Sequence, residues 1–152
     1  MISEADVSSW EVYAMADIVR RIEYYYTIVP NRAGAGAKVL NALKAGGVNL
    51  IAYNGFPTSP RRAQLDFVPV DRDTFLAAAR QAGIKLVGPK IAFLVQGEDR
   101  VGALAGIVSK LGQAQINITA MQATAAGEGR YGAILWVKPR NVGKAAQTLG
   151  VS

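Results

Sequence analysis

The sequence contains no cysteine and no histidine. The absence of cysteine excludes disulfides, thiolate nucleophiles and thiolate metal sites, and the absence of histidine removes the usual general base near pH 7 and the commonest metal ligand. No nucleophile is paired with a base elsewhere, and Gly34-Ala35-Gly36 lacks the downstream glycine and lysine of a phosphate-binding loop. We therefore expect no enzyme, no metal site and no cofactor.

Long apolar runs are absent as well. None approaches the roughly 18 residues of a membrane span, and the N-terminus lacks the order of a signal peptide, so the expected location is the cytoplasm, with no membrane partner. The composition, 51% hydrophobic and 18% charged, is typical of a globular chain. Because 17 lysines and arginines outnumber 11 acidic residues, acidic partners such as nucleic acid have to be considered.

The sequence contains an internal repeat. Asn31-Arg32-Ala33-Gly34-Ala35 recurs 68 positions later as Asp99-Arg100-Val101-Gly102-Ala103. The offset continues without a gap through Leu50 and Ile118, and six of the aligned pairs are identical, where composition alone gives roughly one. The sequence thus predicts a duplication, with an N-terminal extension (1–22), a first module (23–88) and a second module (89–152).

Each copy shows the same order of predicted elements. The hydrophobic periodicity and turn residues indicate a strand (24–29 and 91–96), a helix (34–45 and 102–113), a hairpin (50–56 with 63–68, and 118–124 with 131–137) and a second helix (about 71–82 and 141–149). Asp71 and Asp73 can cap and favourably charge the start of the helix at about 71–82, and Asn141 can cap the helix at 141–149. This order predicts the α+β class, as two tandem ferredoxin-like βαββαβ modules, each an antiparallel sheet with its helices on one face.

The two copies differ at their ends. Ile84–Val87 can form the last strand of the first module, whereas only Val151 and Ser152 follow Gly150, so the second module lacks a full last strand. The N-terminal segment or a second chain can fill that place at the sheet edge. Within the N-terminal segment, Ser9 can cap a helix with one apolar face (Val12, Met15, Ala16, Val19, Ile22), and the alternative is that Ile18 onward extends the first strand.

The strands of the second copy are apolar on both faces, as in Ile91, Phe93 and Val95 against Ala92 and Leu94. Helices can cover only one face of a sheet, and modules of this size bury little surface alone. We therefore expect a homodimer.

The turn between the first strand and the first helix carries the strongest chemical signal. It places unpaired backbone amides at a helix start, which suits a carboxylate or phosphate, and Gly34 or Gly102 leaves room for a ligand. Asn31 or Asp99 can cap the helix, and Asp99 can also accept a hydrogen bond from an ammonium group. These groups together favour a small zwitterion such as an amino acid.

At these residues the chain resembles the ACT domain family, whose small regulatory modules carry Asp-Arg-x-Gly or a variant in this turn. Asp99-Arg100-Val101-Gly102 matches it, Asn31-Arg32-Ala33-Gly34 is a close variant, and Asn49 and Asn117-Ile118 resemble the family's asparagine before the second strand. The resemblance implies paired modules, a ligand lying between the turn of one and the second strand of the other, and amide hydrogen bonds from Asn49 and Asn117. A sensor of this kind reports ligand binding either through its own oligomeric state or through an unidentified regulated protein, and both alternatives stay open.

Other readings of these residues stay open. Gly34 and Gly102 can serve helix packing, Asn49 and Asn117 local backbone bonds, and Arg32 and Arg100 surface ion pairs. Two alternative functions are nucleic-acid binding and protein interaction through the second sheet face. Residues 130–136 loosely resemble the third-strand motif of RNA-recognition modules but have Ala133 where a stacking ring is needed, and the basic residues are dispersed along the sequence.

Overall fold

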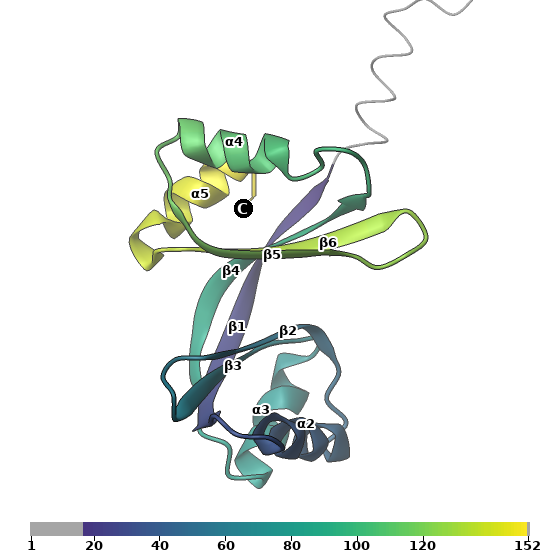
Figure 1. Ribbon diagram of the computed structural model, residues 1–152, viewed down its shortest axis with the longest axis vertical. Coiled ribbons are helices and arrows are strands. Elements are labelled where there is room, and N and C mark those ends of the chain that lie inside the picture. The colour runs from purple at the N-terminus through teal and green to yellow at the C-terminus, as the bar shows by residue number, and fades with distance from the viewer. Residues whose placement is uncertain (1–16, 152) are drawn as a thin grey trace, which may run out of the picture. The chain divides into compact units, whose positions relative to one another are not determined.

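A computed structural model describes residues 17–151 of the chain, which form two compact units. The first unit is Glu23–Lys90, and the second consists of residues 17–22 together with 91–151. Each is an antiparallel sheet with two helices on one face (Figure 1), as the sequence predicts. No helix in the described part of the chain is both long and apolar enough to cross a membrane.

The first unit contains the second part of β1 (Ile18–Pro30), α2 (Ala35–Ala45), β2 (Leu50–Pro57), β3 (Arg62–Pro69), α3 (Arg72–Gln81) and the start of β4 (Val87–Glu98). Its strand order is β2-β3-β1-β4, the order of a ferredoxin-like sheet. Under the helices lies an aromatic core, in which the Phe75 ring centroid is 5.4 Å from that of Tyr25 and 5.6 Å from that of Phe67.

The second unit contains the rest of β4, α4 (Ala105–Gln113), β5 (Ile118–Ala125), β6 (Arg130–Val137), the 3₁₀ helix η1 (Pro139–Asn141) and α5 (Val142–Leu149). Its strand order is β5-β6-β4-β1, so Ile18–Ile22 at the start of β1 occupies the place of the last strand. Val19 from this segment packs against the core around Phe93, Leu111 and Leu135. The expected gap at the sheet edge is thus filled by the N-terminal segment.

The two units exchange strands in the same way. Residues 18–22, which begin β1, belong to the second unit, and residues 87–90, which begin β4, belong to the first. The 68-residue offset also relates β2 to β5 and β3 to β6 residue for residue. We call two residues 68 positions apart equivalent residues.

Three local predictions are wrong. The helix is wrong for Val19 and Ile22, which lie in β1, and the alternative that Ile18 onward extends the first strand is confirmed; Ser9, Val12, Met15 and Ala16 lie outside the described residues. The last strand of the first unit starts at Val87 and not at Ile84, because Ile84 and Leu86 turn toward the core and the Lys85 carbonyl accepts a hydrogen bond of 2.7 Å from the Thr27 hydroxyl. Asn141 precedes α5 without a side-chain cap, because η1 leads directly into the helix.

Asp71 caps α3 as predicted, since its carboxylate accepts hydrogen bonds from the backbone N–H groups of Asp73 and Thr74. Replacing Asp71 with alanine should cost about 1 kcal/mol, which lowers the melting temperature by about 2–4 °C. Asn141→Ala is the matched control, because that side chain caps nothing, and thermal unfolding should show no comparable change. Equal losses in the two variants would contradict the assignment.

Asp66 is 5% exposed, and its carboxylate accepts a hydrogen bond of 2.8 Å from Gln64 Nε2. Burial raises its pKa above the ordinary 3.8, and Gln64 and Lys90 only partly oppose this. The folded protein therefore binds the proton more tightly than the unfolded chain does, so the stability present below pH 3.8 is lost as the pH rises through the raised pKa.

Asp66→Asn removes the charge and keeps an acceptor for Gln64. We expect a higher melting temperature at neutral pH, by about 2–4 °C for each kcal/mol gained, and a difference that shrinks as the pH falls to about 4. Glu128→Gln, at an exposed turn, is the control. A lower melting temperature for Asp66→Asn at pH 7 would show that the ionised carboxylate stabilises the fold.

Candidate functional site

The turn of the second unit, residues 99–104, is held by backbone hydrogen bonds. Asp99 N–H donates to the Gly129 carbonyl at 2.7 Å, which ties the turn to the β5–β6 hairpin turn. Ala103 N–H donates to Arg100 and Ala105 N–H to Gly102, and Gly102 has a φ of 73°, a conformation that favours glycine. Because of these tight turns α4 begins at Ala105, three residues later than the predicted start at Gly102.

The predicted capping of the first helices is wrong. The residues at the cap positions are Gly34 for α2 and Leu104 for α4, and neither helix has a side-chain cap. The Asn31 side chain instead donates to the Pro60 carbonyl at 3.3 Å, in the hairpin turn of the first unit. Among the described residues the Asp99 carboxylate makes no hydrogen bond or ion pair, whereas the Asn31 amide is hydrogen-bonded.

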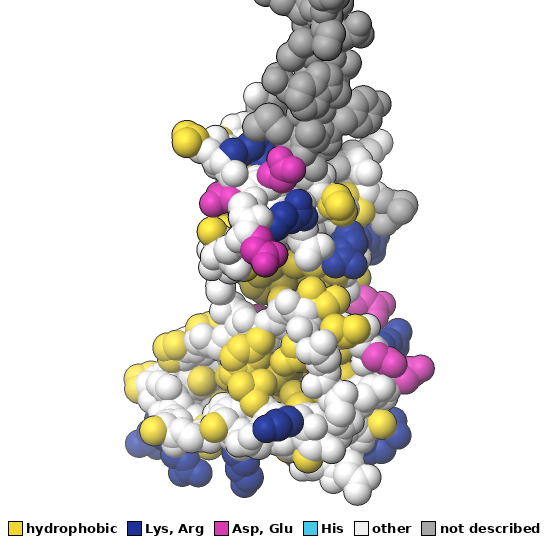
Figure 2. Space-filling model, turned by 90° about the vertical axis from the view of Figure 1, so that its right-hand side faces the viewer, with side chains coloured by type: hydrophobic (Ala, Val, Ile, Leu, Met, Phe, Trp, Pro, Cys, Tyr) yellow, Lys and Arg dark blue, Asp and Glu magenta, His cyan; other side chains and the backbone are white. Residues whose placement is uncertain are grey.

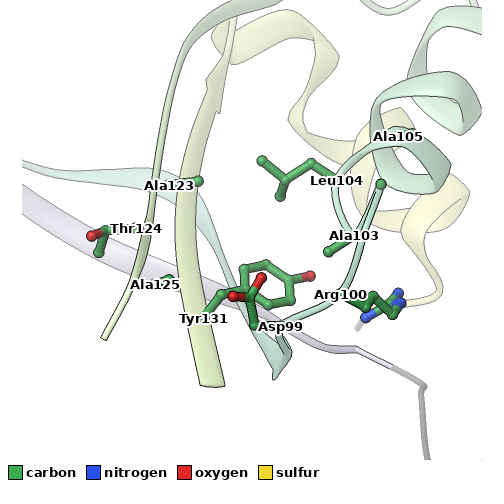
Figure 3. Close-up of a pocket in the computed structure, with 10 residues that line it drawn as sticks. Asp99, Arg100, Ala103, Leu104, Ala105, Ala123, Thr124, Ala125 and Tyr131 are labelled. Atoms are coloured by element: carbon green, nitrogen blue, oxygen red, sulfur yellow. The ribbon is translucent and has the colours of Figure 1, made fainter. Parts of the chain in front are cut away.

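A cleft of about 320 Å³ opens between this turn and the end of the β5–β6 hairpin (Figure 3). Its volume is at the lower end of the range for small-molecule sites. It is lined by Asp99, Arg100, Gly102, Ala103, Leu104, Ala105, Ala123, Thr124, Ala125 and Tyr131. The structure thus brings the predicted residues Asp99, Arg100 and Gly102 together with strand residues that the sequence did not single out.

The cleft combines one carboxylate, free backbone amides and a small apolar wall. Within the described residues, the backbone N–H groups of Gly102 and Leu104 make no hydrogen bond. They lie just before α4, whose dipole adds positive potential there. Leu104 and the alanines of β5 provide the apolar surface (Figure 3). A ligand with an ammonium group, a carboxylate and a small apolar part is complementary to this set.

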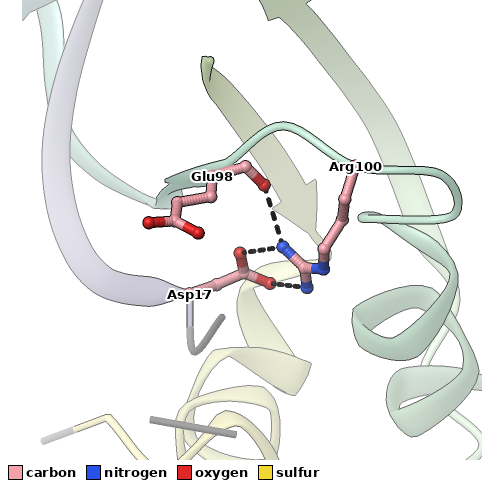
Figure 4. A network of polar contacts seen from close by, with 3 residues as sticks. All are labelled: Asp17, Glu98 and Arg100. Carbon is pink, nitrogen blue, oxygen red and sulfur yellow. Dashed lines mark hydrogen bonds and ion pairs between the residues drawn. The ribbon is translucent and has the colours of Figure 1, made fainter. Parts of the chain in front are cut away.

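Arg100 is engaged in an ion pair. Its guanidinium donates to the two Asp17 carboxylate oxygens at 3.2 and 3.3 Å and to the Glu98 carbonyl at 3.0 Å (Figure 4). The bond to Asp17 raises the pKa of Arg100, so the charge is permanent. A Cβ at position 97 would collide with the Asp17 carboxylate, which explains Gly97. Arg100 therefore anchors the turn to the start of β1.

Tyr131 lines the cleft and is 6% exposed. Its hydroxyl is buried without a hydrogen bond of good geometry among the described residues. Burial and then the nearby Asp17 carboxylate raise the pKa of Tyr131 to about 12, although Arg100 opposes the shift. The phenol is therefore neutral at physiological pH and keeps its proton as a donor.

The remaining predicted residues of the second unit lie elsewhere. Asn117 and Ile118 lie at the start of β5, and the cleft begins at Ala123 near the end of that strand, about 20 Å from Asn117 at about 3.3 Å per residue. Ile118 packs against the core, and the Val101 side chain is fully exposed. One unit therefore does not bring the turn and Asn117 to the same ligand.

The first unit has an equivalent turn, but it lacks the acidic and phenolic side chains of the second. Asn31, Arg32, Ala33 and Gly34 are exposed, and within residues 17–151 the Asn49 side chain accepts one hydrogen bond, from the N–H of its neighbour Leu50 at 3.1 Å. The residues equivalent to Asp99, Tyr131 and Asp17 are Asn31, Ala63 and Lys85. The acidic and phenolic groups of the second turn thus have no counterpart in the first.

Sequence reasoning missed Ala123, Thr124, Ala125, Tyr131 and Asp17. Small residues in a strand and a single tyrosine carry no distinctive pattern, and Asp17 lies 83 positions from Arg100. The sequence did contain one usable signal, because the hairpin turn must lie at the same end of a ferredoxin-like module as the first turn.

Comparison with solved structures agrees with this architecture. Protein BT0572 from Bacteroides thetaiotaomicron superposes with a TM-score of 0.73 at 17% identity, over 88% of each chain. The regulatory subunits of aspartate kinase from Thermus thermophilus and Thermus flavus have TM-scores of 0.60 and 0.56, each at 18% identity over 90% of this chain, covering 97% and 95% of theirs.

The fold is ACT-like. At such low identity the likeness concerns the fold alone, and the neighbours include regulatory subunits. No family model and no curated protein sequence matches the chain.

Proposed function

We propose that the chain is a non-catalytic regulatory module that binds an amino acid or a similar small metabolite in the cleft of the second unit. The observation that carries this is that the turn brings the Asp99 carboxylate and the Gly102 and Leu104 N–H groups, none of them hydrogen-bonded within the described residues, to one cleft of about 320 Å³. The ACT-like fold, shared with regulatory subunits of aspartate kinase, supports a regulatory role.

In this proposal the ligand's ammonium group donates to Asp99, and its carboxylate accepts from the N–H groups of Gly102 and Leu104. Its side chain lies against Ala123 and Ala125, and this wall favours a small, uncharged side chain. Arg100, which also lines the cleft, holds the turn through its ion pair with Asp17. The first unit, with Asn31 in place of Asp99, is not an equivalent site.

Asn117 reaches such a ligand only from a neighbouring module, because it lies at the far end of β5 from its own cleft. This favours a homodimer in which the Asn117 end of one module faces the cleft of another. Dimerisation, a cytoplasmic location and the role of Asn49 remain predictions.

Thermal unfolding with each of the common amino acids tests the proposal. A ligand at about 100 times its Kd adds roughly 2.7 kcal/mol, so at least one amino acid should raise the melting temperature by about 5–10 °C. The corresponding amino alcohols and decarboxylated amines are the matched controls, since each lacks a carboxylate for the turn amides. If no amino acid changes the melting temperature, the proposed function is wrong.

A further inference from the structure

The positive charge of the chain is concentrated in the first unit. Residues 23–90 hold nine of the 17 lysines and arginines but only four of the 11 acidic residues. None of these four acids pairs with the other cations of the unit. Asp66 is buried, Asp71 caps α3, Asp73 lies in the first turn of that helix, and Glu23 pairs with Arg72 at 3.4 Å. The unit therefore presents a strong excess of free cations.

Six of these cations lie at one end of the unit, which we call the turn end. The end is defined by two contacts: Asn31 N–H donates to the Arg61 carbonyl at 2.9 Å, and Pro30 lies opposite Arg62 in the β1–β3 register. The cations there are Arg32, Lys38, Arg61, Arg62, Arg80 and Lys85. All six are exposed, and none makes an ion pair within residues 17–151.

The acids lie elsewhere in the same unit. Glu23, Asp71 and Asp73 are at the opposite end of its strands and helices from the turn end. On the face seen in Figure 2, dark-blue side chains line the lower edge of this unit, apart from the magenta ones. Nothing among the described residues neutralises the turn end.

The second unit shows that this charge is not a requirement of the fold. The residues equivalent to Asn31, Pro60 and Lys85 are Asp99, Glu128 and Asp17, so three acids of the second turn end are replaced by an amide, a proline and a lysine. Arg100 pairs with Asp17, but the equivalent pair, Arg32 and Lys85, has like charges. The two turn ends thus combine opposite electrostatics with the same backbone fold.

Exposed apolar side chains lie next to the cations of the turn end. Ile28 and Phe56 are 44% and 38% exposed. Both pair with Gln64 of β3 in the sheet register, Ile28 from β1 and Phe56 from β2. Arg62 is two residues before Gln64, so its side chain emerges on the same sheet face. Cations beside exposed apolar groups are complementary to a protein segment in which acidic residues alternate with apolar ones.

We propose that the turn end of the first unit docks an acidic, partly apolar segment of a separate protein. Nucleic acid fits less well, because single strands bind by stacking bases on several aromatic rings along a track of cations. The two exposed rings of β2, Tyr53 and Phe56, are three residues apart in the strand and so point to opposite faces of the sheet. This docking surface is separate from the proposed amino-acid cleft, and either can fail without the other.

The test is fluorescence anisotropy of the full chain with a labelled peptide that repeats the tripeptide of two glutamates and one phenylalanine. A single-stranded RNA oligonucleotide is measured in parallel. We expect the peptide to bind, and to bind more weakly as salt rises from about 50 to 200 mM. Arg62→Glu should weaken it at least about tenfold, whereas Arg130→Glu, at the equivalent position of the second unit, should leave the affinity unchanged.

Equal effects of Arg62→Glu and Arg130→Glu, or no peptide binding at low salt, would overturn the docking surface. RNA that binds more tightly than the peptide and is released by Arg62→Glu would overturn the assignment of the partner as a protein. Circular dichroism of the two variants establishes that any difference is not due to loss of folding, since both side chains are exposed on β-strand ends.

Discussion

Replacing Asp99 with asparagine should weaken amino-acid binding by about 10–100-fold, because a charge-assisted hydrogen bond to the ammonium group contributes about 1.5–3 kcal/mol. The change is nearly isosteric. It leaves the turn intact, since the turn is held by the Asp99 backbone N–H and not by the side chain. It also converts the position to the asparagine found at the equivalent Asn31. Isothermal titration calorimetry with the amino acid identified in the thermal screen measures the loss.

Glu128→Gln is the control for Asp99→Asn. Glu128 lies in the neighbouring hairpin turn and does not line the cleft, so its loss changes the net charge equally without removing a ligand contact. The two variants thus separate a direct contact from long-range attraction. If both weaken binding to the same extent, Asp99 does not contact the ligand.

Val19→Asp should lower the melting temperature by about 5–10 °C. Val19 packs against the core of the second unit, and burying an unpaired carboxylate there costs roughly 2–3 kcal/mol. The effect arises because residues 18–22 supply the strand that the second module does not contain after α5. Thermal unfolding followed by circular dichroism measures it.

Val87→Asp is the matched control, because Val87 is the equivalent residue at the start of β4 but is 47% exposed. A carboxylate there remains in water, so we expect a loss well below that of Val19→Asp. A Val19→Asp variant as stable as the unaltered chain would contradict the assignment of residues 18–22 to the core of the second unit.

The element order of both modules could be predicted because the repeat made each signal appear twice. The hairpin strands were predicted to within one residue at each end, since Pro57 to Pro60 and Ala126 to Gly129 are strong turn sequences. The Asp71 cap was predicted for a similar reason, because an aspartate before an apolar helical period has few other roles.

That the N-terminal segment supplies the missing strand of the second module could be predicted only as one of two alternatives, the other being a second chain. β1 runs for 13 residues, yet nothing in Ile18–Ile22 indicates that it pairs in a different unit from the residues that follow. Pairing partners in a sheet are set by tertiary packing, and a local pattern does not encode them. The same limit explains why Val19 and Ile22 fitted a helical face equally well.

The turn of the second unit was located correctly, but the contacts of its side chains could not be predicted from the neighbouring residues alone. Asp99 was expected to cap α4, whereas two tight turns delay the helix and leave the carboxylate at the cleft. Arg100 was considered either a ligand contact or a surface ion pair; the bidentate pair with Asp17 confirms the ion pair, and the ligand contact stays a prediction. That partner is invisible in a sequence that separates the two residues by most of the chain.

The most direct test of the amino-acid cleft is calorimetric titration of the identified amino acid into the unaltered chain and into Ala123→Trp. Ala123 is exposed on edge strand β5 and lines the cleft, so an indole there should fill the cleft without disturbing the core. We predict saturable heat for the unaltered chain and none for Ala123→Trp, with similar melting temperatures when no ligand is present. Equal binding by the two chains would show that the amino acid does not occupy this cleft.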